Sequence, residues 1–572
     1  MPIDQLSLDI LWNRLIATVN EQAATLMRSS FTSIVREAGD LSAGVFDRRG
    51  RMVAQAVTGT PGHINSMATG VIHFLERFPI ESIAPGDVLV TNDPWKTASQ
   101  LNDITVVTPV FKSGRLVALF ANCCHALDIG GRGLSADSRS VFEEGLFIPV
   151  MKLYDKGKPV EALFELLQAN VRTPEEVLGD IHSQVVGNEA GASQLLSFMD
   201  EFDLNDIEEL ADEIISRSET AMRQRIRDLP DGRYAYQLSI DGFEEPLELK
   251  AEIVVKDDEL TVDFAGSPGP VPLGVNVCLN YTAAYTTYGI KCALSPDVPN
   301  NEGSFRPVHI AAPEGSLLNA KYPAAIGGRH LVGHFLPSVV MGALAQALPD
   351  RVIAPGFDGL WDTHISGTSA KTGKHFSYTW FASGGTGALR HKDGLSATAY
   401  PSGIAGVPAE VTEALSPLVI RRRELRADSG GAGTHRGGLG QTFEIEVLTD
   451  EPYLFSGLYE RTEHPAPGLS GGHAGPPGRL LANKDVGLKP KISQLLPEDT
   501  VVTLEIPGGG GFGSPLQRSP DKVLDDVVNG YVSLEAAKSD YGVIIDVKTW
   551  TVDRAETDAL RQQLGEQTGV SN

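Results

Sequence analysis

The stretch from residue 4 to about residue 35 carries a hydrophobic pattern that determines how the N-terminal part of the chain can fold. Apolar residues recur there at three- and four-residue spacing without an interrupting proline, at Leu8, Leu11, Leu15, Val19, Ala23 and Leu26. This spacing predicts one long amphipathic helix. At 1.5 Å per residue the helix would be roughly 45 Å long, so the N-terminal part has to be built on a long helix with one apolar face.

The sequence after this helix switches to the two-residue alternation and β-branched composition of strands. Residues 44–56 predict a hairpin with Arg49-Gly50 at its turn. Residues 86–94 and 102–127 are rich in Val, Thr, Leu and Phe and predict buried strands. Helix returns at Thr173, where the segment TPEE predicts a capping box, and continues with breaks to about residue 227.

The remainder of the chain is dominated by short strands and by glycine and proline, with helices predicted over residues 335–348 and near residue 520. A chain of 572 residues has room for roughly three or four domains, or for fewer large ones. We expect an α+β fold that is mixed, strand-rich and multidomain, with a long N-terminal amphipathic helix. Residues 1–230 would form a mixed α/β domain with the candidate metal site, and residues 231–572 a strand-rich region that can divide near residue 420.

Composition excludes several classes of partner. The chain has 48 Lys and Arg against 73 Asp and Glu, a formal charge of −25, so it would repel nucleic-acid phosphates and anionic lipid. No apolar run approaches the roughly 18 residues of a membrane span. The four cysteines form no CxxC pair, which favours a cytoplasmic location.

Two short motifs that resemble known catalytic or nucleotide-binding signatures lack the surroundings those functions need. Glycines at residues 508–513 spell GxGxxG, but Ser514-Pro515 follows them in place of a helix, which favours a tight glycine loop. Residues 468–472 spell GxSxG among prolines, which favours a surface turn. Because a GxxxxGK[ST] phosphate loop is also absent from the sequence, we expect no nucleotide site on this chain.

Polar groups gather at the ends of the apolar strands between residues 37 and 128. They are Asp40, His63, Asp93, Gln100, Asp103, His125 and Asp128. Imidazole and carboxylate groups on separate strand ends can converge on one divalent ion such as Zn, Mn or Fe. Spacing alone leaves the alternatives open, because Asp93-Pro94 can start a turn and His125 can be a hydrogen-bonded core histidine.

Several segments in the same order resemble the B subunit of the hydantoinase/oxoprolinase family, and the resemblance covers nearly the whole chain. The clearest are EAGDLS (37–42), NDPWKTASQLND (92–103), NCCHALDIGG (122–131), FEEGLFIPVMKL (142–153) and PGGGGFGSP (507–515). The family includes ATP-dependent N-methylhydantoinase, 5-oxoprolinase, caprolactamase, and the acetone and acetophenone carboxylases.

The resemblance implies a partner and a site. The partner is an A subunit that binds ATP and Mg, in an assembly such as (AB)2. ATP would phosphorylate the oxygen of a cyclic amide, which then opens. The metal ligands carried over from the family are Asp40, Gln100, Asp103 and His125. The catalytic candidates, which would orient ligands or move protons, are Asp40, His63 and Asp128.

Two departures from the family pattern stand out. Gln100 occupies the position of a family metal-binding histidine, and an amide oxygen is a weaker ligand than an imidazole. Residues 325–338 also differ from the family and place Arg329, His330 and His334 in the expected substrate region. Arg329 is suited to clamp a carboxylate or a phosphate, while the alternative is a helix start at which the histidines only cap and pack.

Three functions follow from these observations. The first is the B subunit of an ATP-dependent cyclic-amide hydrolase. The second is a subunit of an ATP-dependent ketone carboxylase, with a ketone as the substrate. The third is a non-catalytic scaffold subunit whose metal site has decayed, as Gln100 suggests.

Overall fold

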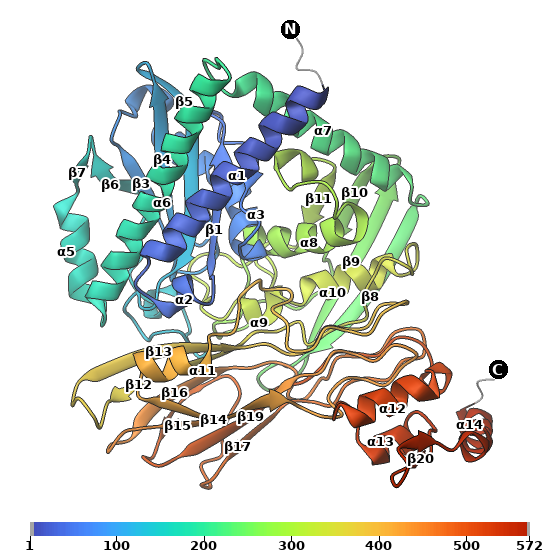
Figure 1. Cartoon of the computed structure of the whole chain (residues 1–572). Coiled ribbons are helices and arrows are strands. Elements are labelled where there is room, and N and C mark those ends of the chain that lie inside the picture. The colour runs from blue at the N-terminus through green and yellow to red at the C-terminus, as the bar shows by residue number, and fades with distance from the viewer. Residues whose placement is uncertain (1–4, 569–572) are drawn as a thin grey trace. The chain divides into compact units, whose positions relative to one another are not determined.

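The computed structural model describes residues 5–568, which form two compact units (Figure 1). Unit 1 takes the described residues within Met1–Gln237, Leu249–Ala343 and Pro401–Val407, and unit 2 takes the others. The predicted division near residue 230 lies close to the first crossing between the units, but residues 249–343 return to unit 1. The last crossing lies at residue 407, short of the predicted subdivision near residue 420.

A seven-stranded antiparallel sheet forms the centre of unit 1. Its spatial order is β2 (Met52–Gln55), β1 (Leu41–Phe46), β5 (Arg115–His125), β4 (Asp103–Lys112), β3 (Val88–Thr91), β6 (Met151–Asp155) and β7 (Lys158–Pro159). The predicted hairpin at residues 44–56 is confirmed, since β1 pairs with β2. The predicted strands at residues 86–94 and 102–127 correspond to β3, β4 and β5.

Helices cover both faces of this sheet. On one face α1 (Gln5–Ser29) and α6 (Pro174–Glu201) pack against Val45 and Phe120. On the other face α3 (Pro61–Gly70) and α4 (Ile72–Arg77) pack against Phe46 and Leu119. Successive side chains of a strand point to opposite faces, and both faces of this sheet are covered. The central strands are therefore buried along almost their whole length. Their continuous apolar runs follow from this double cover.

The N-terminal helix is confirmed, but it ends at Ser29, earlier than the hydrophobic pattern predicts. Asp180 of α6 accepts hydrogen bonds from the backbone N–H groups of Phe31 and Thr32, at 2.7 and 3.3 Å. These bonds turn the chain away from the helix axis, and the short helix α2 (Ser33–Arg36) follows. The end of α1 is therefore set by a residue about 150 positions away.

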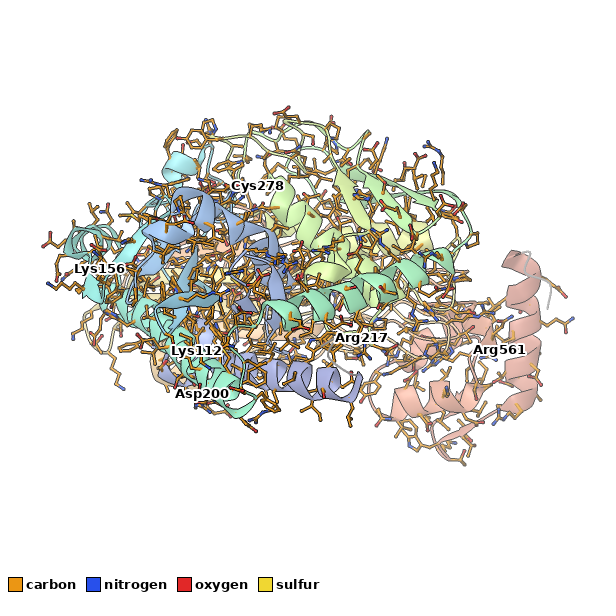
Figure 2. The ribbon with its side chains drawn as sticks, turned by 90° about the horizontal axis from the view of Figure 1, so that it is seen from above. Lys112, Lys156, Asp200, Arg217, Cys278 and Arg561 are labelled. Atoms are coloured by element: carbon orange, nitrogen blue, oxygen red, sulfur yellow. The ribbon has the colours of Figure 1, made fainter. Side chains whose placement is uncertain are left out.

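The helices predicted between residues 173 and 227 are α6 and α7 (Glu208–Arg227). The predicted cap is wrong in one respect: α6 begins at Pro174, but the side chain of Thr173 makes no capping hydrogen bond. At the other end of α6, the last turn contacts the end of β4, where Nζ of Lys112 lies 2.7 Å from a carboxylate oxygen of Asp200. Figure 2 shows these two residues beside each other.

Unit 1 also contains further helices and most of a second sheet. The helices include α5 (Glu161–Asn170), α8 (Leu279–Leu294), α9 (His330–Gly333) and α10 (Leu336–Leu344), the last within the predicted helix at 335–348. Helix α8 packs against α3, where the Asn65 amide donates to the carbonyl oxygen of Ala284. A second sheet has the order β11 (Val308–Ala311), β10 (Glu259–Asp263), β9 (Leu247–Lys256) and β8 (Gly232–Ile240).

Unit 2 contains two four-stranded sheets that share one hydrophobic core. The first has the order β13 (His375–Ala382), β12 (Trp361–Thr368), β16 (Tyr453–Leu458) and β18 (Ser493–Leu496). The second has the order β14 (Leu418–Leu425), β15 (Gln441–Val447), β19 (Val501–Glu505) and β17 (Arg479–Ala482). The remaining elements are α11 (Ala409–Leu415), α12 (Pro520–Val528), α13 (Leu534–Ser539), β20 (Ile545–Asp546), β21 (Thr551–Val552) and α14 (Arg554–Thr568). The predicted α+β class is confirmed.

The glycine run at residues 508–513 is a packing device in unit 2. A Cβ atom on Gly509 would lie 2.0 Å from the carbonyl oxygen of Thr386, far inside a normal contact distance. The first α-helix after the run is α12, so the run does not open a helix. This agrees with a tight glycine loop.

Within residues 5–568, no helix combines the length and the hydrophobicity needed to cross a membrane.

Candidate active site

Three strand ends meet at one edge of the seven-stranded sheet. Strands β1 and β4 both run antiparallel to β5, which lies between them, so their first residues lie beside the last residue of β5. Asp40 precedes β1, Asp103 begins β4, and His125 ends β5 directly opposite Asp103 in register. The Nδ1 atom of His125 lies 3.0 Å from Asp103 Oδ1, and its backbone N–H donates to the carbonyl oxygen of Asp40. The structure therefore brings these three predicted residues together.

His63 and Gln100 complete the predicted set from outside the sheet. His63 lies in the first turn of α3, with Nε2 3.2 Å from Asp103 Oδ2 and Nδ1 3.6 Å from Asp40 Oδ1. It therefore lies between the two carboxylates. Gln100, in the loop before β4, donates from Nε2 to the carbonyl oxygen of Gly327. Both side chains are buried.

Arg329 enters the same group from the start of α9. Its Nε donates to the carbonyl oxygen of Ala98 at 3.1 Å and its Nη1 to Gln100 Oε1 at 2.5 Å, while its Nη2 donates to Asp103 Oδ2. The guanidinium carbon lies 4.5 Å from the centre of the Tyr281 ring. The residue is 4% exposed, so this cation is held inside the protein. We call the group the carboxylate–arginine cluster; it consists of Asp40, His63, Gln100, Asp103, His125 and Arg329.

The two histidines that follow Arg329 lie beside the cluster in an aromatic layer. His334 Nε2 lies 3.3 Å from the hydroxyl of Tyr281, and its ring packs against Tyr285 and His330. Burial, with the charge of Arg329 adding to it, lowers the pKa of His330 to about 3. Burial also lowers the pKa of His334 well below its ordinary value. Both rings are therefore neutral at physiological pH.

Charges within the cluster stabilise one another. Burial by itself would raise the pKa of Asp103, but the cations of Arg329 and His63 hold that pKa well below its usual range. Burial by itself would lower the pKa of His63, but the charges of Asp103 and Asp40 outweigh it and raise that pKa. His63 thus lies between two carboxylates that favour its protonated form.

Asp128 lies in a different set of contacts, although it follows β5 closely. Its carboxylate accepts hydrogen bonds from the backbone N–H of Gly130 at 3.0 Å and from Arg172 Nη1 at 2.7 Å. It also accepts from the backbone N–H of Arg172. The structure does not place Asp128 in the cluster, because these contacts use its carboxylate to fix the loop after β5.

The cluster contains the donor types of a metal site but is not arranged as one. Within residues 5–568, no group of three or more His, Cys, Asp or Glu side chains is placed to hold a metal ion. The guanidinium of Arg329 contacts both Asp103 and Gln100, two of the four predicted ligands. A divalent ion about 4 Å from this cation would be repelled by about 8 kcal/mol at an effective dielectric constant of about 20. As arranged, these residues do not fit a divalent ion, and metal binding stays a prediction.

Sequence reasoning missed three groups that support the cluster: Thr60, Glu144 and Tyr281. The hydroxyl of Thr60 donates to Asp40 Oδ1 at 3.1 Å, although Thr60 stands before Pro61 in the position typical of a helix cap. Tyr281 belongs to a set of tyrosines at four- and three-residue spacing on α8, a pattern that indicates one buried face. Glu144 is a charged residue directly before an apolar run.

Glu144 positions the segment that leads into Arg329. Its Oε1 atom accepts hydrogen bonds from the backbone N–H groups of Ile326 and Gly327, at 2.7 and 2.8 Å, and from the hydroxyl of Ser138. The residue is 6% exposed. Burial raises the pKa of Glu144 to about 7, against the effect of these hydrogen bonds.

The raised pKa of Glu144 predicts a pH-dependent contribution to stability. A carboxyl group whose folded pKa is raised contributes stability that is present below its unfolded pKa of 4.5 and is lost as the pH rises through about 7. Glu144→Gln should remove up to about 3 kcal/mol of this pH dependence. Melting temperatures of both proteins between pH 5 and pH 8 measure it. Glu143→Gln, at a half-buried neighbour whose carboxylate pairs with Arg132, is the control. Parallel curves for the wild type and Glu144→Gln would contradict the prediction.

Comparison with known proteins identifies the family. The hydantoinase B/oxoprolinase family description matches residues 4–515. The chain is 30% identical to the β subunit of caprolactamase from Pseudomonas jessenii, and the match covers 98% of this chain and 99% of that one. The crystal structure of ATP-dependent caprolactamase from the same organism has a TM-score of 0.89 at 28% identity, covering 98% of this chain and 100% of that chain.

A second solved structure shares the architecture at lower identity. Acetone carboxylase in its nucleotide-free state has a TM-score of 0.87 and 21% identity, covering 99% of this chain and 84% of that chain. At this identity the likeness shows the fold alone. The chain belongs to the hydantoinase B/oxoprolinase family, as the sequence motifs indicated.

Proposed function

We propose that this chain is the B subunit of an ATP-dependent cyclic-amide hydrolase and that the activated ring opens at the carboxylate–arginine cluster. The observation that carries the proposal is the placement of His63 between two buried carboxylates, 3.2 Å from Asp103 and 3.6 Å from Asp40. Membership of the family and the likeness to ATP-dependent caprolactamase support the reaction class.

The chemistry of amide opening explains why such a cluster is needed. An amide resists water because resonance stabilises its carbonyl and nitrogen is a poor leaving group, and transfer of a phosphoryl group to the oxygen removes that resonance. Water then adds to the ring carbon and loses a proton, and the ring nitrogen gains a proton as the C–N bond breaks. His63 is the group that would accept and return this proton. The product of this step is an acyl phosphate, from which a second water releases phosphate to leave the acid.

Arg329 has a complementary role in the proposal. Three of the five guanidinium N–H groups donate to protein oxygens. The other two would hold a phosphate oxygen or the oxygen that becomes negative when water adds.

Two alternatives remain as proposals. A ketone carboxylase subunit is one alternative, because the family resemblance includes the acetone and acetophenone carboxylases. A non-catalytic scaffold is favoured by Gln100, which contacts Arg329 where the family resemblance expects a metal-binding histidine. Release of ADP by the chain with its A-type subunit separates them. Stimulation of ADP release by hydantoin, 5-oxoproline or caprolactam supports the hydrolase. Stimulation by acetone with bicarbonate supports the carboxylase, and ADP release that none of these compounds stimulates supports the scaffold.

The proposal predicts that the isolated chain does not bind ATP. The sequence has no phosphate-binding loop, and the resemblance places ATP on the A-type partner. Calorimetric titration of the purified chain with MgATP should show no binding tighter than about 100 μM, which corresponds to roughly −5.5 kcal/mol. Tighter binding, or ATP hydrolysis by the isolated chain, would defeat this division of labour.

The proposal also includes a stable complex with the A-type subunit. The caprolactamase relative is named as a β subunit, which is the name of one chain of a larger assembly. Co-expression of a tagged A-type subunit should retain this chain during purification, and the mass of the complex would test an (AB)2 assembly. A monomeric chain that opens cyclic amides by itself would count against it.

A further inference from the structure

The cation of the cluster is part of the polypeptide. We propose that Arg329 takes the place of a divalent ion in this chain, so that the site is built around a fixed guanidinium and does not bind a metal. The identity of the cation in the cluster can be tested without testing the reaction proposed above.

The side chain of Arg329 occupies the positions where a metal ion would be bound. All three of its side-chain hydrogen bonds go to the segment from Ala98 to Asp103, which contains two of the predicted metal ligands. Asp103 is 0% exposed and Gln100 is 2% exposed, so these contacts are made inside the protein. A buried carboxylate needs a cation or hydrogen-bond donors, and Arg329 provides both.

The hydrogen-bonding groups of Gln100 also complement those of Arg329 and its segment. Gln100 accepts from Arg329 Nη1 through its oxygen and donates through its nitrogen to the carbonyl oxygen of Gly327, two residues before Arg329. A glutamine can do both at once, because its amide has an acceptor and donors at one end. The two departures from the family pattern, one at residue 100 and the other within residues 325–338, therefore meet in one hydrogen bond. They form one coupled change in the site.

The guanidinium of Arg329 faces an aromatic ring. Its carbon lies 4.5 Å from the centre of the Tyr281 ring, a distance typical of a cation–π contact. The planar guanidinium stacks well on such a ring. The site thus provides a carboxylate, an amide oxygen, a carbonyl oxygen and an aromatic face, which together are a binding site for an arginine side chain.

Metal binding by the full-length chain tests the inference. Wild-type protein and the double variant Gln100→His/Arg329→Met are purified, their Zn and Mn contents are measured by mass spectrometry, and each is titrated with Zn²⁺ and Mn²⁺. We expect substoichiometric metal in the wild type. The double variant should bind at least one of these ions about 100-fold more tightly, since it loses a like charge and gains an imidazole ligand.

Controls separate the swap from the loss of any buried arginine. Arg436 is also buried beside an aspartate, Asp526, and near a tyrosine ring, so Arg436→Met is the matched control and should gain no metal. Arg329→Lys keeps the charge and should gain none either. If the double variant is unstable, Gln100→His/Arg329→Gln replaces it, and stabilisation by Mn²⁺ or Zn²⁺ in a thermal melt is the readout.

Two outcomes would overturn the inference. The first is a wild-type chain that carries one tightly bound metal ion per molecule. The second is a folded double variant that binds Zn²⁺ and Mn²⁺ no better than the wild type. Both results can be read without any enzymatic assay.

Discussion

Replacing Asp103 by asparagine is expected to lower the free energy of unfolding of the chain by about 3–5 kcal/mol. The substitution keeps the shape of the side chain but removes the negative charge that faces Arg329 and His63. Both cations are buried, so neither can be compensated by water. Urea or thermal unfolding of the two proteins measures the difference.

A second variant shows whether the lost charge pair is the cause. Asp103→Asn/Arg329→Met removes both charges, and it should recover a large part of the stability because neutral replacements of a buried pair are often tolerated. Asp155→Asn, at an exposed carboxylate paired with Lys152, should change stability by less than about 1 kcal/mol. An Asp103→Asn protein as stable as the wild type would show that the buried pair is not formed.

Replacing His63 by alanine should reduce turnover by the complex with the A-type subunit by at least about 100-fold, the usual contribution of a general acid–base group. His63 is the side chain that lies between Asp40 and Asp103, so its loss removes the proposed route for the proton. The rate of ring opening at saturating ATP and cyclic amide is the measurement.

The pH dependence of the same reaction gives an independent check. A general base must be unprotonated, and the carboxylates raise the pKa of His63 above its ordinary value of 6.5. Activity should therefore fall as the pH drops through a value above 6.5. His73→Ala, at a more exposed histidine paired with Glu76, should leave rate and profile unchanged. A His63→Ala enzyme with near-normal turnover would remove His63 from the mechanism.

Local patterns were sufficient to predict most of the secondary structure of unit 1. The periodicity from Leu8 to Leu26 predicted α1, and the turn at Arg49-Gly50 predicted the hairpin of β1 and β2. The end of α1 was not predictable, because it depends on hydrogen bonds to Asp180 in another helix. The capping box predicted at Thr173 was wrong as well: the helix begins at Pro174, but the side chain of Thr173 makes no hydrogen bond to it.

The site shows the same division between local and long-range information. Asp40, Asp103 and His125 could be predicted to converge, because each adjoins an end of a strand and antiparallel pairing brings those ends together. Arg329 could not be placed against Asp103, because 226 residues separate them and no sequence period links them. Asp128 satisfied the same strand-end rule, but Arg172 binds its carboxylate elsewhere.

The product formed by the chain and its A-type subunit tests the proposed function most directly. The pair is incubated with ATP and with caprolactam, 5-oxoproline or hydantoin, and the products are analysed by mass spectrometry beside a reaction with acetone and bicarbonate. The hydrolase account predicts a ring-opened acid that has gained the elements of water, formed only with ATP and accompanied by ADP and phosphate. A carboxylated ketone as the only product, or ring opening that does not require ATP, would contradict it.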